Sequence, residues 1–195
     1  MHKIDITNVA NEVMYLYEKY GKKDYIGEPV SQIEHMCQCA QLAEANGADE
    51  ETILAAFLHD IGHLCEYAFP ETTAQHMDGF GIVDHEKLGA AFLLSKGFSK
   101  KITQLVQSHV SAKRYLTYAF NDYYNQLSDA SKITLQHQGG IMTKEEAVVF
   151  ENDILFEQYI AIRKWDEQAK KTHQPLPDLQ DYKDLIIEHL ALQNS

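Results

Sequence analysis

The chain has 195 residues, which is enough for one well-buried domain and short for two. Hydrophobic residues make up 45% and charged residues 24%, as in ordinary globular proteins, and no apolar run approaches the roughly 20 residues that span a bilayer. The formal net charge of −12 argues against a nucleic-acid partner. It also means that an anionic substrate would need a local cationic pocket.

The N-terminal stretch and the cysteines bear on where the protein works. Met-His-Lys-Ile-Asp is too polar for a signal peptide. The three cysteines, Cys37, Cys39 and Cys65, are odd in number and form no Cys-x-x-Cys pair. They fit reduced thiols better than a disulfide framework. We therefore expect a cytoplasmic protein without a membrane partner, and the sequence leaves its oligomeric state open.

Helical periodicity dominates the chain and strand-like alternation is scarce, so we expect an all-α fold. A first amphipathic helix is expected at about 5–20 and a loop at 24–29. The next helix would pass through His35 and end near Asn46, with Gly47 as its stop signal.

The following helix carries a cluster of ionisable residues. Asp49 is expected to cap this helix. The helix would present His59, Asp60 and His63, with His59 and His63 on one face. Residues 65–83 are the least regular stretch, and we expect a long loop there, which in a compact domain is often functional. The remaining helices are expected at about 84–97, 99–109, 112–119, 128–138, from 143, at 154–171 and at 179–193. No linker interrupts them, so we predict a single domain over residues 1–195.

Four histidines recur about one helical hairpin apart: His35, His59, His85 and His109. Antiparallel helices would bring all four towards one core. Four unrelated histidines with satisfied hydrogen bonds are the alternative. The adjacent Asp60 argues against it, because an apolar helical stretch gains nothing from two neighbouring ionisable groups unless both are bound. Imidazole and carboxylate are natural ligands for borderline divalent metals and iron.

The number of candidate ligands favours two metal ions. With Asp166, the four histidines and Asp60 exceed the needs of one zinc or iron centre. Asp60 is the natural bridge between two ions, and His63 would orient a ligand or a bound water. The other histidines receive no such role: we expect His2, His173 and His189 at the surface, and His76 and His137 in local hydrogen bonds.

Arginine is rare, since only Arg114 and Arg163 occur among 17 basic residues. Arg163 lies three residues before Asp166, and Lys113 lies four after His109, so each pair would share a helix face. Arg163 could neutralise Asp166 or lie in solvent. It could also bind a phosphate-like group, which its planar fork recognises well.

Several sequence words resemble the HD-domain superfamily, and among its members the mixed-valent diiron oxygenases that cleave phosphonates. The general pattern is His35, His59-Asp60 and Asp166. The words closer to this branch are Asp-Tyr-Ile-Gly-Glu at 24–28, Gln-Ile-Glu-His at 32–35, Leu-Ala-Ala-Phe-Leu-His-Asp at 54–60, His-Glu-Lys at 85–87, His-Val-Ser-Ala-Lys-Arg-Tyr-Leu at 109–116, Leu-Ser-Asp-Ala-Ser at 127–131, Gln-Gly-Gly at 138–140 and Arg-Lys-Trp-Asp-Glu at 163–167. The resemblance covers about residues 24–167. Extra length in the 65–83 loop is the departure that bears on substrate preference.

The resemblance implies a helical bundle of the HD type with two iron ions, O2 as co-substrate and a small organophosphonate as partner. One iron would take His35, His59, Asp60 and Asp166, and the other would take Asp60, His85 and His109. The implied catalytic residues are Tyr25, Glu28, His63 and Lys113, with Tyr25 and Glu28 gating the open iron. The implied substrate-binding residues are Lys113, Arg163, Ser131, Gln138 and Glu28. Without the resemblance, Tyr25 reads as an ordinary half-buried loop tyrosine.

The function expected from this resemblance is oxidative cleavage of the C–P bond of a 1-hydroxyalkylphosphonate. The first candidate is 2-amino-1-hydroxyethylphosphonate, which would give glycine and phosphate. The alternative is a metal-dependent phosphohydrolase of nucleotides or phosphate esters, in which the same ligands would activate water. A ligand-binding sensor without catalysis is disfavoured because the ligand set is complete.

Overall fold

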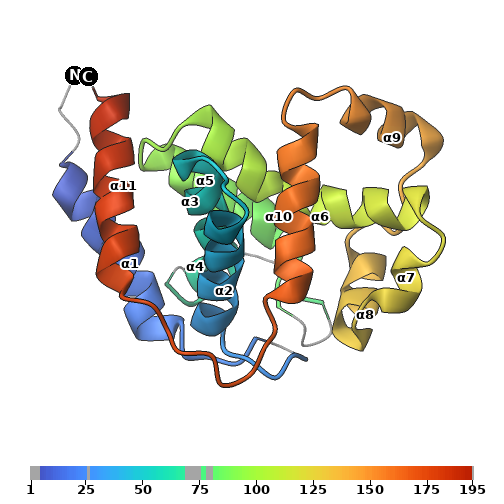
Figure 1. Ribbon diagram of the computed structural model, residues 1–195, viewed down its shortest axis with the longest axis horizontal. Coiled ribbons are helices and arrows are strands. Elements are labelled where there is room, and N and C mark those ends of the chain that lie inside the picture. Colours follow the sequence, from blue (N-terminus) through green and yellow to red (C-terminus); the bar gives the residue numbers. More distant parts are fainter. Residues whose placement is uncertain (1–4, 26, 69–75, 78–80, 195) are drawn as a thin grey trace.

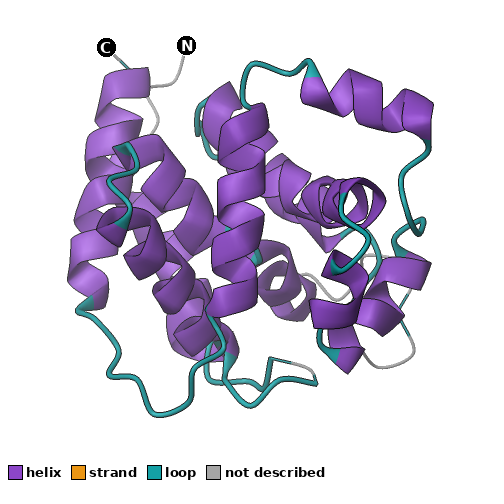
Figure 2. Cartoon of the chain, turned by 45° about the vertical axis from the view of Figure 1, so that its right-hand side comes forward, coloured by secondary structure: helices purple, strands orange, loops and turns teal. Residues whose placement is uncertain are grey.

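The computed structural model describes residues 5–25, 27–68, 76–77 and 81–194, and these residues form eleven helices and no strand (Figures 1 and 2). The only β-type pairings among them are two isolated bridges, Asp24 with Ser31 and His76 with Ile82. The helices are α1 (Ile6–Tyr20), α2 (Gln32–Ala45), α3 (Glu50–Leu58), α4 (Ile61–Ala68), α5 (His85–Ser95), α6 (Lys100–Ala119), α7 (Tyr123–Gln126), α8 (Asp129–His137), α9 (Lys144–Glu151), α10 (Phe156–Gln168) and α11 (Leu179–Gln193). The predicted all-α fold is confirmed. No helix in the described part of the chain is long and apolar enough to cross a membrane.

Short polar side chains start most of these helices. Asp49 accepts from the backbone N–H of Thr52 and starts α3, and Ser99 accepts from that of Ile102 and starts α6. Such caps satisfy backbone donors that have no partner inside the helix. Ser31 forms a full capping box with Glu34 at the start of α2, which fixes the helix that carries His35.

In the centre, α3 and α10 pack against each other and against both α2 and α6, while α5 lies against α6 and α4 lies against α5 (Figure 1). On one side, α1 and α11 cover α3 through stacked rings: Tyr17 on Phe57 at 4.4 Å between centroids, and Phe57 on Tyr182 at 4.3 Å. The Tyr17 hydroxyl also donates to the carbonyl of Phe57 at 2.7 Å. On the other side, α7, α8 and α9 lie beyond α6 and α10 in Figure 1. This packing holds the end of α3 near the middle of the molecule.

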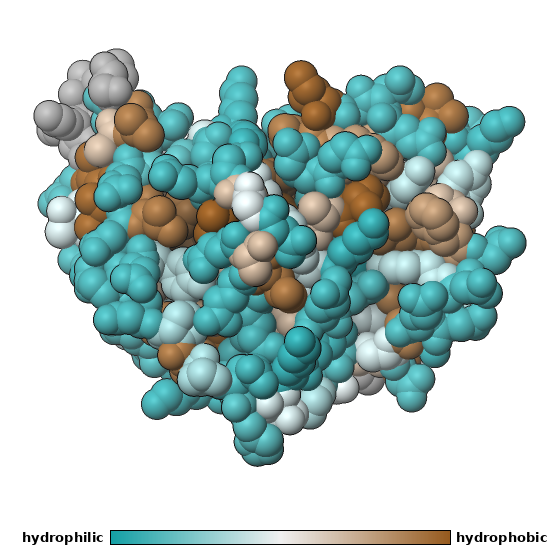
Figure 3. All heavy atoms as spheres, in the orientation of Figure 1, coloured by the Kyte–Doolittle hydropathy of each residue, from teal (hydrophilic) through white to brown (hydrophobic). Residues whose placement is uncertain are grey.

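The surface is mostly polar. Figure 3 shows a face dominated by hydrophilic residues with separate hydrophobic patches. Exposed apolar residues occur in and beside α9, including Val149 and Ile154.

The helix predicted to carry the His59-Asp60 pair is in fact two helices. α3 ends at Leu58, His59 and Asp60 form a turn, and α4 begins at Ile61. Close packing against α5 accompanies this turn, because a Cβ at Gly62 would lie 1.9 Å from the carbonyl oxygen of His85. The prediction that His59 and His63 share one helix face is therefore wrong.

The predicted break between 99–109 and 112–119 is also wrong, because α6 is continuous from Lys100 to Ala119. It contains neither glycine nor proline, so nothing in its backbone interrupts the helix. His109 consequently lies within a helix and not at its end. The predicted 65–83 loop begins later than expected, since α4 reaches Ala68. The rest of that prediction falls largely outside the described residues.

Two smaller expectations also need correction. The short helix α7 was not predicted. His189, expected at the surface, is buried, stacks on Phe98 and accepts from the backbone N–H of Ser99 at 3.1 Å. A buried imidazole needs such a partner, which is available only because α11 reaches the start of α6. His173 is exposed as expected, and His2 lies outside the described residues.

Candidate metal centre and anion pocket

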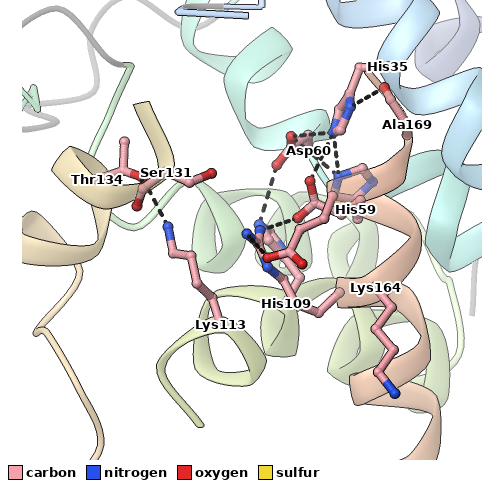
Figure 4. A network of polar contacts seen from close by, with 12 residues as sticks. His35, His59, Asp60, His109, Lys113, Ser131, Thr134, Lys164 and Ala169 are labelled. Carbon is pink, nitrogen blue, oxygen red and sulfur yellow. Dashed lines mark hydrogen bonds and ion pairs between the residues drawn. The ribbon is translucent and has the colours of Figure 1, made fainter. Parts of the chain in front are cut away.

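The six predicted metal ligands meet at one point in the core. They come from α2, the α3–α4 turn, α5, α6 and α10, and all are buried. Figure 4 shows His35, His59 and His109 around Asp60. Residues that are far apart in the sequence therefore form a single cluster in the fold: His35, His59, Asp60, His85, His109 and Asp166.

Asp60 lies between two sets of donor atoms. Its Oδ2 atom lies 3.3 Å from Nε2 of His59 and 3.5 Å from Nε2 of His35. Its Oδ1 atom lies 3.2 Å from Nε2 of His85 and 3.3 Å from Nε2 of His109. Asp166 belongs to the first set, with Oδ1 3.3 Å from Nε2 of His35. Neighbouring ligand atoms around a cation with bonds of about 2.1 Å lie about 3 Å apart, so these spacings suit one ion in each set.

Hydrogen bonds to backbone carbonyls fix which nitrogen of three imidazoles faces the cluster. Nδ1 of His35 donates to Ala169 O at 2.9 Å, that of His59 to Ala56 O at 2.8 Å, and that of His109 to Val106 O at 2.8 Å. A carbonyl oxygen can only accept, so Nδ1 carries a proton and Nε2 faces inward, where the neutral form of the ring would present its lone pair to a cation. This is the usual arrangement of a metal-ligating histidine.

Unsatisfied atoms show that the donor set suits cations. Asp60 Oδ2 and Asp166 Oδ1 are buried and have no hydrogen-bond partner among the described residues. The Nε2 atoms of His35 and His59 lie only 3.1 Å apart, and those of His85 and His109 2.9 Å apart. Nitrogen atoms so close together need a proton or a metal ion between them. The residues present therefore fit two bound metal ions.

The charge state of the carboxylates supports this fit. Burial opposes ionisation of Asp60, but in the metal-free protein the charge of a protonated His59 and hydrogen bonds from the neighbouring imidazoles hold the pKa of Asp60 well below its usual range, and bound cations would take the place of these protons. Burial likewise opposes ionisation of Asp166, and the Arg163 guanidinium holds its pKa well below the usual range. Both groups are therefore anionic inside the core, where a bare charge is costly unless it is paired.

His63 lies beside the second set. Its ring stacks on His85 at 4.0 Å between centroids, and a ligand atom of each of Asp60, His63 and His85 lies within 4.8 Å of the others. Burial and the neighbouring His85 lower the pKa of His63 well below its usual value, so its imidazole is neutral. The neutral imidazole of His63 can therefore accept a hydrogen bond from a molecule bound beside Asp60 and His85.

A small cavity of about 50 Å³ opens next to the second set. Eleven of the thirteen predicted site residues line it, and the other two, His35 and His59, lie beyond Asp60. The lining residues from the prediction are Tyr25, Glu28, Asp60, His63, His85, His109, Lys113, Ser131, Gln138, Arg163 and Asp166. A larger groove of about 560 Å³ lies between α1, α4 and α5 and holds none of them.

Lys113 brings an amine into this cavity with little access to solvent. It is 3% exposed, and Nζ donates to Thr134 Oγ1 at 2.9 Å (Figure 4). Burial and the charge of Arg163 lower the pKa of Lys113 to about 7. Ser131 and Gln138 lie nearby on the α8 side, and Gln138 Oε1 is buried without a hydrogen-bond partner among the described residues. This wall can bind an anion.

Arg163 neutralises Asp166, which is one of the alternatives that the sequence left open, and it also reaches the cavity. It is 4% exposed, pairs with Asp166 through Nη1, and also donates to Tyr123 at 3.1 Å and to Glu167 at 2.9 Å. It therefore neutralises Asp166 and lines the cavity at the same time. Arg114 is different, because it pairs with Glu146 at 2.9 Å and joins α6 to α9 outside the cavity.

Tyr25 and Glu28 reach the cavity from the loop before α2. The Tyr25 ring stacks on His35 at 4.0 Å between centroids. Burial and the charge of Asp60 raise the pKa of Tyr25 well above its usual value, so the phenol keeps its proton. Glu28 Oε1 accepts from Ser128 Oγ at 2.5 Å and from Lys170 Nζ at 2.6 Å. Both side chains are thus held at the mouth of the site.

Several residues of the site were not predicted, and three of them are ionisable or bind an ionisable group. Thr134 is the hydrogen-bond partner of Lys113, and Lys170 pairs with Glu28. Glu86 is buried, and its Oε2 lies 3.8 Å from Nδ1 of His85; neither atom has a hydrogen-bond partner among the described residues. Only Glu86 carried a local signal, since it directly follows a predicted ligand.

Comparison with known proteins agrees with this geometry. The family pattern described as "HD domain" matches residues 33–185. The chain belongs to the HD-domain family. This HD-domain chain is 42% identical over 186 residues to uncharacterized protein L432 of Acanthamoeba polyphaga mimivirus, which covers 95% of the chain and 83% of that protein.

Two further relatives carry functional names. The [1-hydroxy-2-(trimethylamino)ethyl]phosphonate dioxygenase (glycine-betaine-forming) of Leisingera caerulea is 40% identical over 176 residues, 90% of the chain and 87% of that protein. The hydroxymethylphosphonate dioxygenase of Gimesia maris is 39% identical over 167 residues, 86% of the chain and 81% of that protein. These relatives confirm the predicted resemblance and the prediction of an oxygenase enzyme.

Proposed function

We propose that this protein is a diiron oxygenase that cleaves the C–P bond of a small 1-hydroxyalkylphosphonate. The first candidate substrate is 2-amino-1-hydroxyethylphosphonate. The observation that carries the proposal is that a cluster with two donor sets sharing Asp60 opens into the same cavity as two buried cations, Lys113 and Arg163. The names of two relatives, both phosphonate dioxygenases, support oxidation over hydrolysis.

The reaction balances with one O2 per substrate. 2-Amino-1-hydroxyethylphosphonate and O2 together contain the atoms of glycine and phosphate. The C–P bond breaks, four electrons leave the substrate, and O2 accepts them, so no external reductant is needed. Two bound irons would supply Lewis acidity toward the substrate oxygens and the redox capacity that O2 chemistry requires.

The residues of the chain divide the remaining work. His35, His59, Asp60 and Asp166 would hold one iron, and Asp60, His85 and His109 would hold the other and leave it open toward the cavity. His63 lies where it can orient a molecule bound there.

The cavity wall would bind the phosphonate. Lys113 and Arg163 supply the positive charge, and Ser131 and Gln138 add hydrogen-bonding groups. A charge-assisted hydrogen bond to a buried anion contributes about 1.5–3 kcal/mol. Tyr25, which lines the same cavity as Asp60, His85 and His109, would cover the open iron until substrate arrives, and Glu28 would face the substituent on the substrate.

Phosphate release by the iron-loaded protein tests the proposal. The protein should hold about two irons per chain, as a two-metal site requires. It should release phosphate from hydroxyphosphonates in air, not under anaerobic conditions, and not from nucleotides. Release from nucleotides regardless of oxygen would identify a phosphohydrolase instead. A single structural zinc bound by only three of the six ligands would rule out the diiron site.

A further inference from the structure

Lys170 carries a positive charge to a carboxylate at the edge of the cavity. Its Nζ lies 2.6 Å from Oε1 of Glu28, although the two residues are 142 positions apart in sequence. The side chain of Lys170 is 16% exposed and that of Glu28 is 8% exposed. Glu28 lines the cavity, whereas Lys170 does not. The lysine therefore acts on the cavity through the carboxylate.

The backbone around Lys170 is fixed by the metal cluster. The preceding residue, Ala169, is the C-cap of α10, and its carbonyl oxygen accepts from Nδ1 of His35 at 2.9 Å. Ser128 donates to the same oxygen of Glu28 that Lys170 contacts. Glu28 is thus held between α8 and the end of α10, and the ion pair is a built part of the site.

This pairing changes what Glu28 attracts. An isolated carboxylate in a poorly solvated cavity strongly attracts a cation, but a carboxylate with an ammonium at 2.6 Å has almost no net charge. A cationic group on a substrate must displace Lys170 from Oε1 or bind Oε2 beside a second cation. Burial, the Arg163 charge and, more weakly, the Lys170 charge together lower the pKa of Lys113, so the Lys170 charge reaches the cavity.

We propose that Lys170 is a specificity-determining residue of this site: by neutralising Glu28, it weakens the preference for substrates that carry a cationic group. The proposal rests on the proposed function, since it concerns the substituent on a phosphonate. It refines the proposal that Glu28 faces the substituent on the substrate. Lys170 sets how much of the Glu28 charge a substrate encounters.

Two phosphonates of equal size test this proposal. 2-Amino-1-hydroxyethylphosphonate carries an ammonium where 1-hydroxypropylphosphonate carries a methyl group. Their dissociation constants are measured by calorimetry on iron-loaded protein under anaerobic conditions, where no turnover occurs. The parent is compared with Lys170→Met, Lys170→Gln and Lys170→Arg. Lys164→Met is the matched control, because Lys164 is exposed on α10 and points away from the cluster in Figure 4.

Loss of one charge-assisted hydrogen bond to Glu28 should shift the ratio of the two dissociation constants at least about tenfold toward the amine in Lys170→Met. Lys170→Gln can still hydrogen-bond Glu28 but has no charge, so it should shift the ratio in the same direction. Lys170→Arg and Lys164→Met should keep the parent ratio. If both constants change equally in Lys170→Met and Lys170→Gln, Lys170 only shapes the loop and the proposal is wrong. If neither compound binds the parent, the phosphonate substrate class fails, and this proposal fails with it.

Discussion

Replacing Lys113 with methionine should change how the stability of the metal-free protein depends on pH. Lys113 is buried, and its pKa is lowered from 10.5 to about 7. Between these values the unfolded chain binds a proton that the folded chain does not, so stability rises as pH rises. The slope approaches about 1.4 kcal/mol per pH unit for one group. From pH 7 to pH 9 this gives a gain of about 2 kcal/mol.

Methionine has a similar length and no charge, so Lys113→Met should lack this gain. Thr134 does not lose all its partners, because its hydroxyl donates to the carbonyl of Ser131 at 3.2 Å. The assay is reversible urea unfolding of chelator-treated protein at pH 7, 8 and 9 in a buffer without phosphate. Lys164→Met, an exposed change of the same kind, should keep the parent slope.

Equal slopes in the parent and in Lys113→Met would refute the reasoning. Such a result would mean that the amine stays protonated in the folded protein up to pH 9. The expected result also predicts how the affinity for a phosphonate changes with pH. A phosphonate prefers the protonated amine, so its binding takes up a proton above pH 7, and its affinity falls as the pH rises from 7 to 9.

Three further predictions concern the cluster. Asp60→Asn should lower bound iron from about two per chain to less than one while the helical circular dichroism is retained, because the amide cannot bridge two cations; full iron content would exclude the bridge. Tyr25→Phe keeps a ring to stack on His35 but lacks the phenol, so it should consume O2 without substrate faster than the parent does, as an oxygen electrode would show; equal rates would rule out the gate. Glu86→Leu removes the carboxylate near Nδ1 of His85. It should weaken metal retention against a chelator by about 10–100-fold, and unchanged retention would leave Glu86 without a role at the metal.

The clustering of the candidate ligands could be predicted because their residue types stand out from their surroundings. His59 and Asp60 directly follow five apolar residues, and a polar pair in such a position needs a partner. The helix cap at Asp49 could be predicted for a similar reason, since a cap depends on a few neighbouring residues. Features that depend on a few neighbouring residues could therefore be predicted from the sequence.

The turn at His59 and Asp60 could not be predicted, because periodicity runs through it. Only Gly62 marks the place, and a lone glycine is tolerated inside helices. The close approach of α5 against Gly62 is a tertiary contact that no local pattern encodes. The same limit applies to Lys170: a lysine just after a helix resembles any solvated residue until the distant Glu28 is placed beside it.

The candidate metal ligands and the proposed anion pocket share a carboxylate, which couples their electrostatics. Asp166 presents Oδ1 to His35 and Oδ2 to Arg163. Among the described residues, Asp166, Glu167 and Tyr123 each engage one N–H group of Arg163, and a guanidinium has five, so two remain for an anion. A cation at Oδ1 draws on the same negative charge that pairs with Arg163. Filling the metal site therefore leaves Arg163 less neutralised and more attractive to a phosphonate, so the cluster and the pocket favour occupation of one another.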